Sequence, residues 1–98
     1  MTRDEIIAGL RAMETQLRAR GIARMQMFGS RARGDERPDS DLDLLVDLDP
    51  LARFSLLDLS GIHLDLTERL GIEAYPTIAR SIGERFRLEI APDLVPVF

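Results

Sequence analysis

The chain contains no cysteine and no long apolar run, and both absences narrow the kinds of protein it can be. Without cysteine there is no disulfide framework and no thiolate metal site. No apolar stretch approaches the roughly 18 residues that a membrane span needs, and the first ten residues, MTRDEIIAGL, lack the apolar core of a signal peptide. We therefore expect a cytoplasmic protein with no membrane partner.

A surplus of positive charge is also missing. The chain has 13 basic and 17 acidic residues, which gives a formal net charge of −4. A face that binds the phosphate backbone of a nucleic acid would need a basic surplus, so we expect no free nucleic acid as a partner. The arginines are nevertheless clustered. Arg31, Arg33 and Arg37 lie close together in one stretch, which suits a compact anion better than a long polymer.

The bulk composition is that of a single globular domain. Its 98 residues fall within the usual domain size of about 50 to 200 residues. Hydrophobic residues make up 45% of the chain and charged residues 31%, which is ordinary for a folded protein and wrong for a disordered one. No repeat or linker interrupts the sequence. We expect one domain over residues 1–98.

The first half predicts a helix and two strands. Thr2 and Glu5 have the spacing of a capping box, and apolar residues then recur at helical spacing up to Gly21. Residues 22–28 alternate polar and apolar side chains, as a strand does. Residues 31–40 predict a loop with one helical turn, and residues 41–48 predict a second strand. The apolar residues of the helix are Ile6, Leu10, Met13 and Leu17.

The second half predicts a long helix, a strand, a helix and an edge strand. The long helix covers about 52–70 and carries two apolar stripes. Residues 72–75 predict a third strand, closed by Pro76, and a last helix lies within 77–91 with a capping box at Ser81 and Glu84. The terminal LVPVF predicts a short edge strand, where Pro96 is tolerated. The fold class is therefore α+β, a small mixed sheet covered by helices. The two stripes of the long helix are Leu56, Leu59, Ile62, Leu66 and Leu70, and Phe54, Leu57 and Leu64.

One stretch, MFGSRARGDERPDSDLDLLVDLDP, carries a pattern suited to a nucleoside triphosphate and its metal. Gly29 permits close backbone approach, and Ser30 offers a hydroxyl and an N–H to phosphate. Asp41 and Asp43 project side by side from one face of a strand, which suits carboxylates that bridge two metal ions about 4 Å apart. The alternative is a polar hairpin with exposed carboxylates.

With ten residues between Ser30 and Asp41, this pattern resembles the nucleotidyltransferase signature of the DNA polymerase β-like superfamily. The short chain and the stretch FSLLDLSGIHLDLTERLGIEAYP look like the minimal nucleotidyltransferase (MNT) domains, as in MntA-type antitoxins of HEPN/MNT toxin–antitoxin pairs. The resemblance covers nearly the whole chain. It implies a polymerase β-like nucleotidyltransferase core that attacks the α-phosphate of a nucleoside triphosphate and releases pyrophosphate.

The resemblance also implies roles for particular residues. Gly29 and Ser30 would hold the distal phosphates, while Asp41 and Asp43 would coordinate two Mg²⁺ ions. The family usually has a third carboxylate, an aspartate, on a later strand, and we place Glu73 in that position as a metal ligand and catalytic residue with weakened turnover. Arg31 and Arg33 are candidate nucleotide-binding residues, with solvated loop positions as the alternative.

Two further side chains have simpler interpretations. His63 is the only histidine and has no ligand set to serve, so we expect a surface or half-buried structural role. Tyr75 lies beside the predicted third carboxylate. We expect it to be a core or rim aromatic residue.

MNT domains neutralise a HEPN-domain ribonuclease, and this neutralisation is associated with transfer of AMP from ATP to a toxin tyrosine. The resemblance therefore implies a protein adenylyltransferase antitoxin whose partners are ATP and a HEPN toxin. We also expect the exposed stripe of the 52–70 helix to serve a homo- or hetero-oligomer. Two alternatives stay open: a non-catalytic antitoxin that blocks the toxin by contact, and a nucleotidyltransferase that modifies a small molecule.

Overall fold

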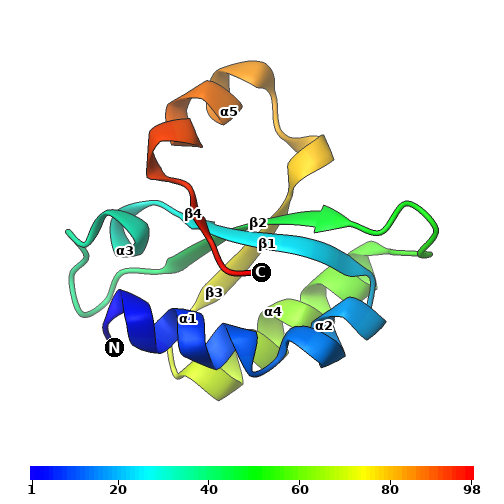
Figure 1. The fold of residues 1–98 in the computed structure, drawn as a ribbon, viewed down its shortest axis with the longest axis horizontal. Helices are drawn as coiled ribbons and strands as arrows, with labels where there is room; N and C mark the ends of the chain where they lie inside the picture. Colours follow the sequence, from blue (N-terminus) through cyan, green and yellow to red (C-terminus); the bar gives the residue numbers. More distant parts are fainter.

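A four-stranded mixed β-sheet with helices on both faces forms the molecule, and the predicted α+β class is confirmed (Figure 1). The computed structural model describes all 98 residues. The strand order is β3-β2-β1-β4, with β1 antiparallel to β2 and β4, and β2 parallel to β3. The strands are β1 (Ile22–Phe28), β2 (Leu42–Leu48), β3 (Ala74–Ile78) and β4 (Val95–Pro96).

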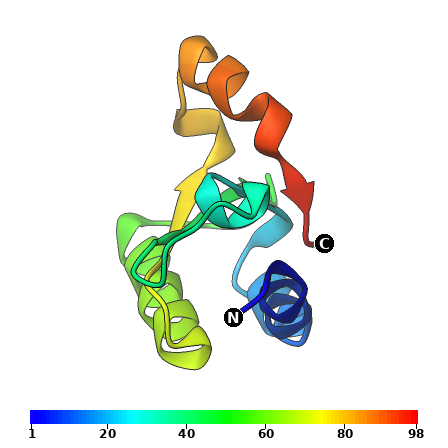
Figure 2. The same ribbon diagram turned by 90° about the vertical axis from the view of Figure 1, so that its left-hand side faces the viewer.

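Three helices cover one face of the sheet, and one helix lies over the other (Figures 1 and 2). The helices α1 (Arg3–Arg11), α2 (Glu14–Ala19) and α4 (Leu56–Leu70) share the first face, whereas α5 (Glu84–Ile90) lies on the second. The four-residue α3 (Ser30–Arg33) follows β1. Short 3₁₀ turns, η1 (Ala79–Ser81) and η2 (Ala91–Asp93), flank α5. No helix is long and apolar enough to cross a membrane.

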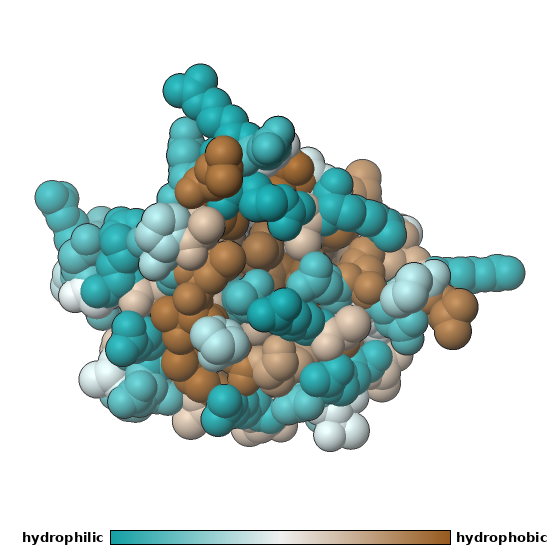
Figure 3. All heavy atoms as spheres, turned by 45° about the horizontal axis from the view of Figure 1, so that its top comes forward, coloured by the Kyte–Doolittle hydropathy of each residue, from teal (hydrophilic) through white to brown (hydrophobic).

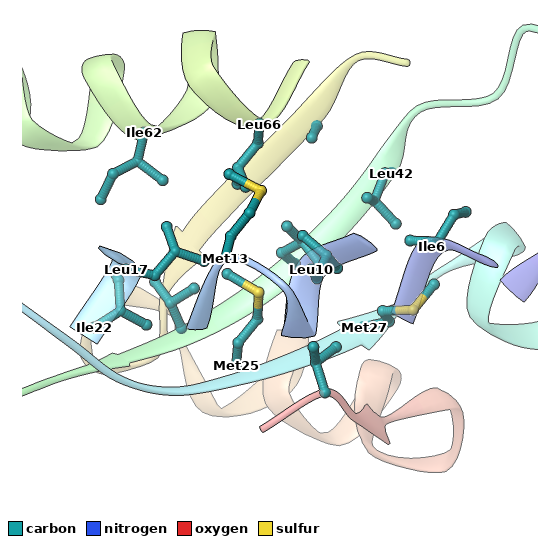
Figure 4. Close-up of a cluster of buried hydrophobic side chains, with 14 of the residues drawn as sticks. Ile6, Leu10, Met13, Leu17, Ile22, Met25, Met27, Leu42, Ile62 and Leu66 are labelled. Carbon is teal, nitrogen blue, oxygen red and sulfur yellow. The ribbon is translucent and has the colours of Figure 1, made fainter. Parts of the chain in front are cut away.

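The main core lies between the sheet and α1, α2 and α4 (Figure 4). Alternate residues of each strand enter it, because successive side chains of a strand point to opposite faces. Leu42, Leu44 and Val46 of β2 are fully buried there, whereas Asp43 and Leu45 between them face the other way. This alternation confirms the predicted pattern of β2 and leaves one sheet face for α5 and the charged residues.

The predicted N-terminal helix is two helices. The capping box of Thr2 and Glu5 forms as predicted. The helix then breaks after Arg11, where Met13 N–H donates to the carbonyl of Leu10, and α2 resumes at Glu14. The predicted apolar face is buried on both sides of the break. The prediction of burial was therefore correct although the helix is not continuous.

The long helix begins at Leu56 rather than near residue 52. Ser55 and Asp58 form a capping box that starts it. Of the predicted wide stripe, Ile62 and Leu66 are fully buried, but Leu56 is exposed. The predicted second stripe does not form one surface. Phe54 precedes the helix and packs against the main core, whereas Leu57 and Leu64 are exposed. The exposed leucines of α4 and of the loop before it are called here the leucine patch: Leu51, Leu56, Leu57 and Leu64.

The third strand runs from Ala74 to Ile78, so its predicted limits of 72 and 75 are wrong. Pro76 lies within the strand instead of ending it. A proline is tolerated there because β3 is an edge strand, with one side of its backbone unpaired. Pro96 lies in β4 at the opposite edge, as predicted. The shifted start leaves Glu73 just before β3 and places Tyr75 within it.

The α5 side of the sheet has a smaller core. Phe28, Leu45, Ala79 and Ile90 form it, and Phe86 of α5 packs edge-on against Phe28 with 5.8 Å between ring centroids. The predicted capping box of Ser81 and Glu84 does not form, because α5 begins after Gly83 with no side-chain cap. In Figure 3, which brings the α5 side forward, hydrophobic atoms show between hydrophilic side chains. This layer therefore covers its sheet face incompletely.

Candidate active site

Asp41 and Asp43 lie at the start of β2 on the face opposite the main core. Asp41 is exposed just before the strand, and Asp43 is half-buried within it. Neither carboxylate belongs to any of the salt bridges of the structure. The predicted geometry of two carboxylates side by side on one strand is therefore present, and the pair lacks a direct positive partner.

The two negative charges disfavour each other. Burial raises the pKa of the Asp43 carboxyl, the charge of Asp41 raises this pKa further, and Arg33 acts in the opposite direction. A divalent cation would offset both effects at once, and Mg²⁺ prefers carboxylate oxygens. The unpaired carboxylates at Asp41 and Asp43 thus fit a hard divalent cation.

Gly29 brings the turn after β1 into direct contact with Asp43. Its φ of +79° and ψ of −162° lie in a region that is essentially restricted to glycine. A Cβ atom at this position would meet Oδ2 of Asp43 at 2.5 Å. Ser30 follows as the first residue of α3. The structure therefore holds Gly29 against Asp43, with Ser30 next to it in the chain.

The two predicted nucleotide-binding arginines have different surroundings. Arg31 is 3% exposed, and its Nε donates to the carbonyl of Ser40 at 2.9 Å. It braces the loop before β2, and its burial leaves little of the guanidinium accessible to a phosphate. Arg33 is exposed and pairs with Asp35 at 3.1 Å and Asp93 at 2.8 Å, which raise the pKa of its guanidinium. Only Arg33 is open to a ligand.

Glu73 lies near Asp41 but does not complete a three-carboxylate cluster. Both residues line a hollow of about 220 Å³. However, no group of three or more His, Asp or Glu side chains comes close enough together to hold a metal ion. Glu73 instead faces the imidazole of His63, with Oε2 3.6 Å from Nε2. The hollow is lined by Pro38, Asp39, Ser40, Asp41, Gly71, Ile72 and Glu73.

His63 and Tyr75 lie closer to the site than the sequence indicated. His63 is half-buried, as expected, and its Nδ1 lies 2.6 Å from the carbonyl of Ala74, to which it donates. Its ring stacks on Tyr75 with 4.7 Å between centroids. Tyr75 pairs with Asp43 across the strands, and the charges of Glu73 and Asp41 raise the pKa of its phenol. Because Glu73 and Tyr75 are two residues apart, a strand through both would place them on the same face of the sheet. Which of them lies beside Asp43 depends on where β3 pairs with β2, and the sequence did not show this.

A Gly-Ser turn that abuts an Asp-x-Asp strand on a mixed sheet is the arrangement expected of a polymerase β-like nucleotidyltransferase. Comparison with known proteins identifies the same class. The family model described as "Nucleotidyltransferase domain" matches residues 10–88, and the chain belongs to this family.

Comparison with individual relatives identifies the part of the family that this chain resembles. The protein adenylyltransferase MntA of Thermococcus cleftensis is 34% identical over 83 residues, which cover 76% of this chain and 84% of that protein. A solved structure assigned to the minimal nucleotidyltransferases is 32% identical, with a TM-score of 0.81 and coverage of 98% of this chain and 96% of that chain. The chain is therefore a member of the minimal, MntA-like branch.

A more distant structure shares the fold. It is the complex of a tri-AMPylated HEPN toxin with an MNT antitoxin from Shewanella oneidensis, and one of its chains gives a TM-score of 0.70 at 12% identity. The alignment covers 99% of this chain and 72% of that chain. At this identity the likeness shows the fold alone.

We expect Gly29→Ala to destabilise the protein by about 2 kcal/mol or more, because the alanine strains the backbone and displaces Asp43. Gly83→Ala is the matched control, since Gly83 has a φ of −74° and a Cβ atom added to it would meet nothing within 4 Å. Its effect should stay below about 1 kcal/mol. Urea unfolding measures both. Equal stability of the two variants would show that the turn does not need glycine.

We expect Asp43→Asn to stabilise the metal-free protein at neutral pH by roughly 0.5 kcal/mol, since it removes a repelled charge that solvent partly screens. The folded-state pKa of Asp43 lies above the unfolded value, so the native state binds more protons between the two values and loses stability as the pH rises through them. The gain should therefore vanish at acidic pH, below both values.

Thermal unfolding between pH 3 and pH 7 measures this difference. Asp39→Asn, at an exposed loop position outside the pair, serves as the control. Added Mg²⁺ should raise the melting temperature of the parent protein and leave that of Asp43→Asn unchanged. A destabilised Asp43→Asn variant at pH 7 would contradict the repulsion.

Proposed function

We propose that the chain is a Mg²⁺-dependent protein adenylyltransferase that transfers AMP from ATP to a hydroxyl of a HEPN-type toxin. The observation that carries this proposal is the unpaired Asp41 and Asp43 couple held against the Gly29–Ser30 turn. Membership of the nucleotidyltransferase family supports the reaction type. The name of the Thermococcus cleftensis relative supports a protein as the acceptor.

The donor side of the site has a clear division of roles. Asp41 and Asp43 would hold Mg²⁺, which offsets the charge of the triphosphate and polarises the α-phosphate. Ser30 would donate its hydroxyl to the distal phosphates, and the contact of Gly29 with Asp43 would keep these phosphates close to the carboxylates. Arg33, near enough to influence Asp43, would add positive charge at the rim.

The acceptor side would be supplied largely by the partner. Its hydroxyl oxygen forms a bond to the α-phosphorus, the bond to the β-phosphate oxygen breaks, and pyrophosphate leaves. The hydroxyl proton passes to Glu73, which shares a hollow with Asp41 and is accessible to solvent. His63, 3.6 Å from the Glu73 carboxylate, would stabilise its orientation.

The leucine patch is the surface on which we place the partner. Leu51, Leu57 and Leu64 are 93%, 84% and 64% exposed, so α4 and the loop before it present apolar side chains to solvent. The structure from Shewanella oneidensis contains an MNT antitoxin bound to a HEPN toxin. A toxin or a second copy of this chain that covers the patch would bury these leucines in the complex.

One observation favours a second function. Tyr75, rather than a carboxylate, lies across from Asp43 on β3, and no three-acid cluster forms. A protein with a weakened site of this kind would neutralise its toxin through contact alone. The exposed leucine patch would then carry the function, and the carboxylates would not.

Incubation with α-labelled ATP, Mg²⁺ and a HEPN toxin separates the two functions. We expect label on the toxin, reduced at least about 100-fold in Asp41→Asn/Asp43→Asn, because both metal ligands are lost. Asp47→Asn, on the same strand outside the pair, should retain labelling. Full neutralisation by the double variant, with no label from the parent protein, would establish the contact-only function instead.

The partner surface makes a separate prediction. Leu57→Glu/Leu64→Glu should weaken binding of the toxin at least about 10-fold, because charge at the centre of an apolar interface is costly. The unfolding temperature should stay the same, since both side chains are exposed. Leu88→Glu, an exposed leucine on α5 across the sheet, is the matched control. Equal affinity of all three proteins, measured by calorimetry, would place the interface elsewhere.

A further inference from the structure

We infer that this chain holds one divalent cation with its nucleotide, and that Tyr75 occupies the place from which a third carboxylate would complete a second cation site. The inference rests on the proposed function and revises the expectation of two Mg²⁺ ions. It follows from the side chains that surround Asp43.

The strand register decides which residues lie beside Asp43. On β3 its partner is Tyr75, and on β1 its partner is Phe28. Neighbouring strands lie about 4.8 Å apart, and paired residues project to the same face. The register is held by the backbone N–H of Leu42, which donates to the carbonyl of Glu73 at 2.8 Å. Both cross-strand partners of Asp43 are therefore aromatic residues, and neither supplies an anionic oxygen.

Glu73 lies one strand repeat too early to replace Tyr75. Two residues along a strand correspond to about 6.6 Å, so the Glu73 backbone is level with Asp41 instead of Asp43. Its carboxylate is also directed toward His63, 3.6 Å away. The stack of His63 on Tyr75, with planes 21° apart, fixes the phenol ring beside Glu73.

The chemistry of the ligands then limits the number of ions. Two cations about 4 Å apart repel strongly and need carboxylates beyond a single pair to offset their charge. A phenol with an ordinary pKa near 10 is neutral at pH 7, whereas Mg²⁺ and Mn²⁺ select anionic oxygen. Asp41 and Asp43 provide enough negative charge for one ion shared with a triphosphate. No third acid joins them.

Electron paramagnetic resonance of Mn²⁺ tests the number of ions without an activity assay. With a non-hydrolysable ATP analogue, the parent protein should bind one equivalent of Mn²⁺ per complex and give the uncoupled six-line spectrum of an isolated ion. Tyr75→Asp adds a carboxylate beside Asp43. It should bind a second equivalent and give a spectrum with exchange coupling between neighbouring ions.

Tyr75→Asn and Tyr75→Phe are the controls, because they change the ring or its hydroxyl without adding charge. Both should bind a single uncoupled ion. Tyr75 is 45% exposed, so these substitutions remove little core packing. Should Tyr75→Asp fail to fold, the count for the parent protein still decides the question.

Two coupled Mn²⁺ ions in the parent protein would overturn the single-ion inference and leave the proposed transferase intact. A folded Tyr75→Asp variant with only one ion would also overturn it, because Tyr75 would then not be the limiting residue. A parent protein that binds neither Mn²⁺ nor the analogue would instead refute the proposed function itself. The two failures are therefore distinguishable.

Discussion

The antiparallel pairing of β1 and β2 is the constraint on which the candidate site depends. It sets Phe28 opposite Asp43, and the chain then turns through Gly29 directly against the Asp43 carboxylate. Only glycine can make this turn, because its conformation and the 2.5 Å approach each exclude a Cβ atom. The burial of alternate β2 residues in the main core fixes the face on which Asp41 and Asp43 project. The packing of the main core thus determines where the two carboxylates lie.

The same arrangement has an energetic cost. A half-buried carboxylate beside a second one destabilises the folded protein, and Arg33 offsets this only in part, since its own ion pairs are with Asp35 and Asp93. Proteins retain such unfavourable groups where they serve binding or catalysis. Arg31 is the opposite case. Its charge is buried, and its guanidinium bonds to a backbone carbonyl of the loop that leads into β2. Two arginines in one short helix therefore perform different tasks, one structural and one at the surface.

Local patterns in the sequence predicted much of this correctly. The bounds of β1, the alternation of β2 and the cap at Thr2 all depend on neighbouring residues, so they can be recognised without tertiary information. The start of β3 could not, because it is set by pairing with β2 and by the tolerance of an edge strand for Pro76. The sequence pattern therefore assigned Glu73 to the site beside Asp43, whereas the structure pairs Asp43 with Tyr75. The burial of Arg31 and the stack of His63 on Tyr75 likewise depend on segments that meet only in the folded chain.

The two prolines of the sheet have a consequence for assembly. Pro76 lies in β3 and Pro96 in β4, so each outer border of the sheet lacks one amide hydrogen. An incoming strand would find an incomplete ladder on either side, which discourages growth of the sheet by annealing to another molecule. Association through side chains of helices and loops is then favoured over pairing of strand edges. The two prolines therefore oppose aggregation through the edges of the sheet.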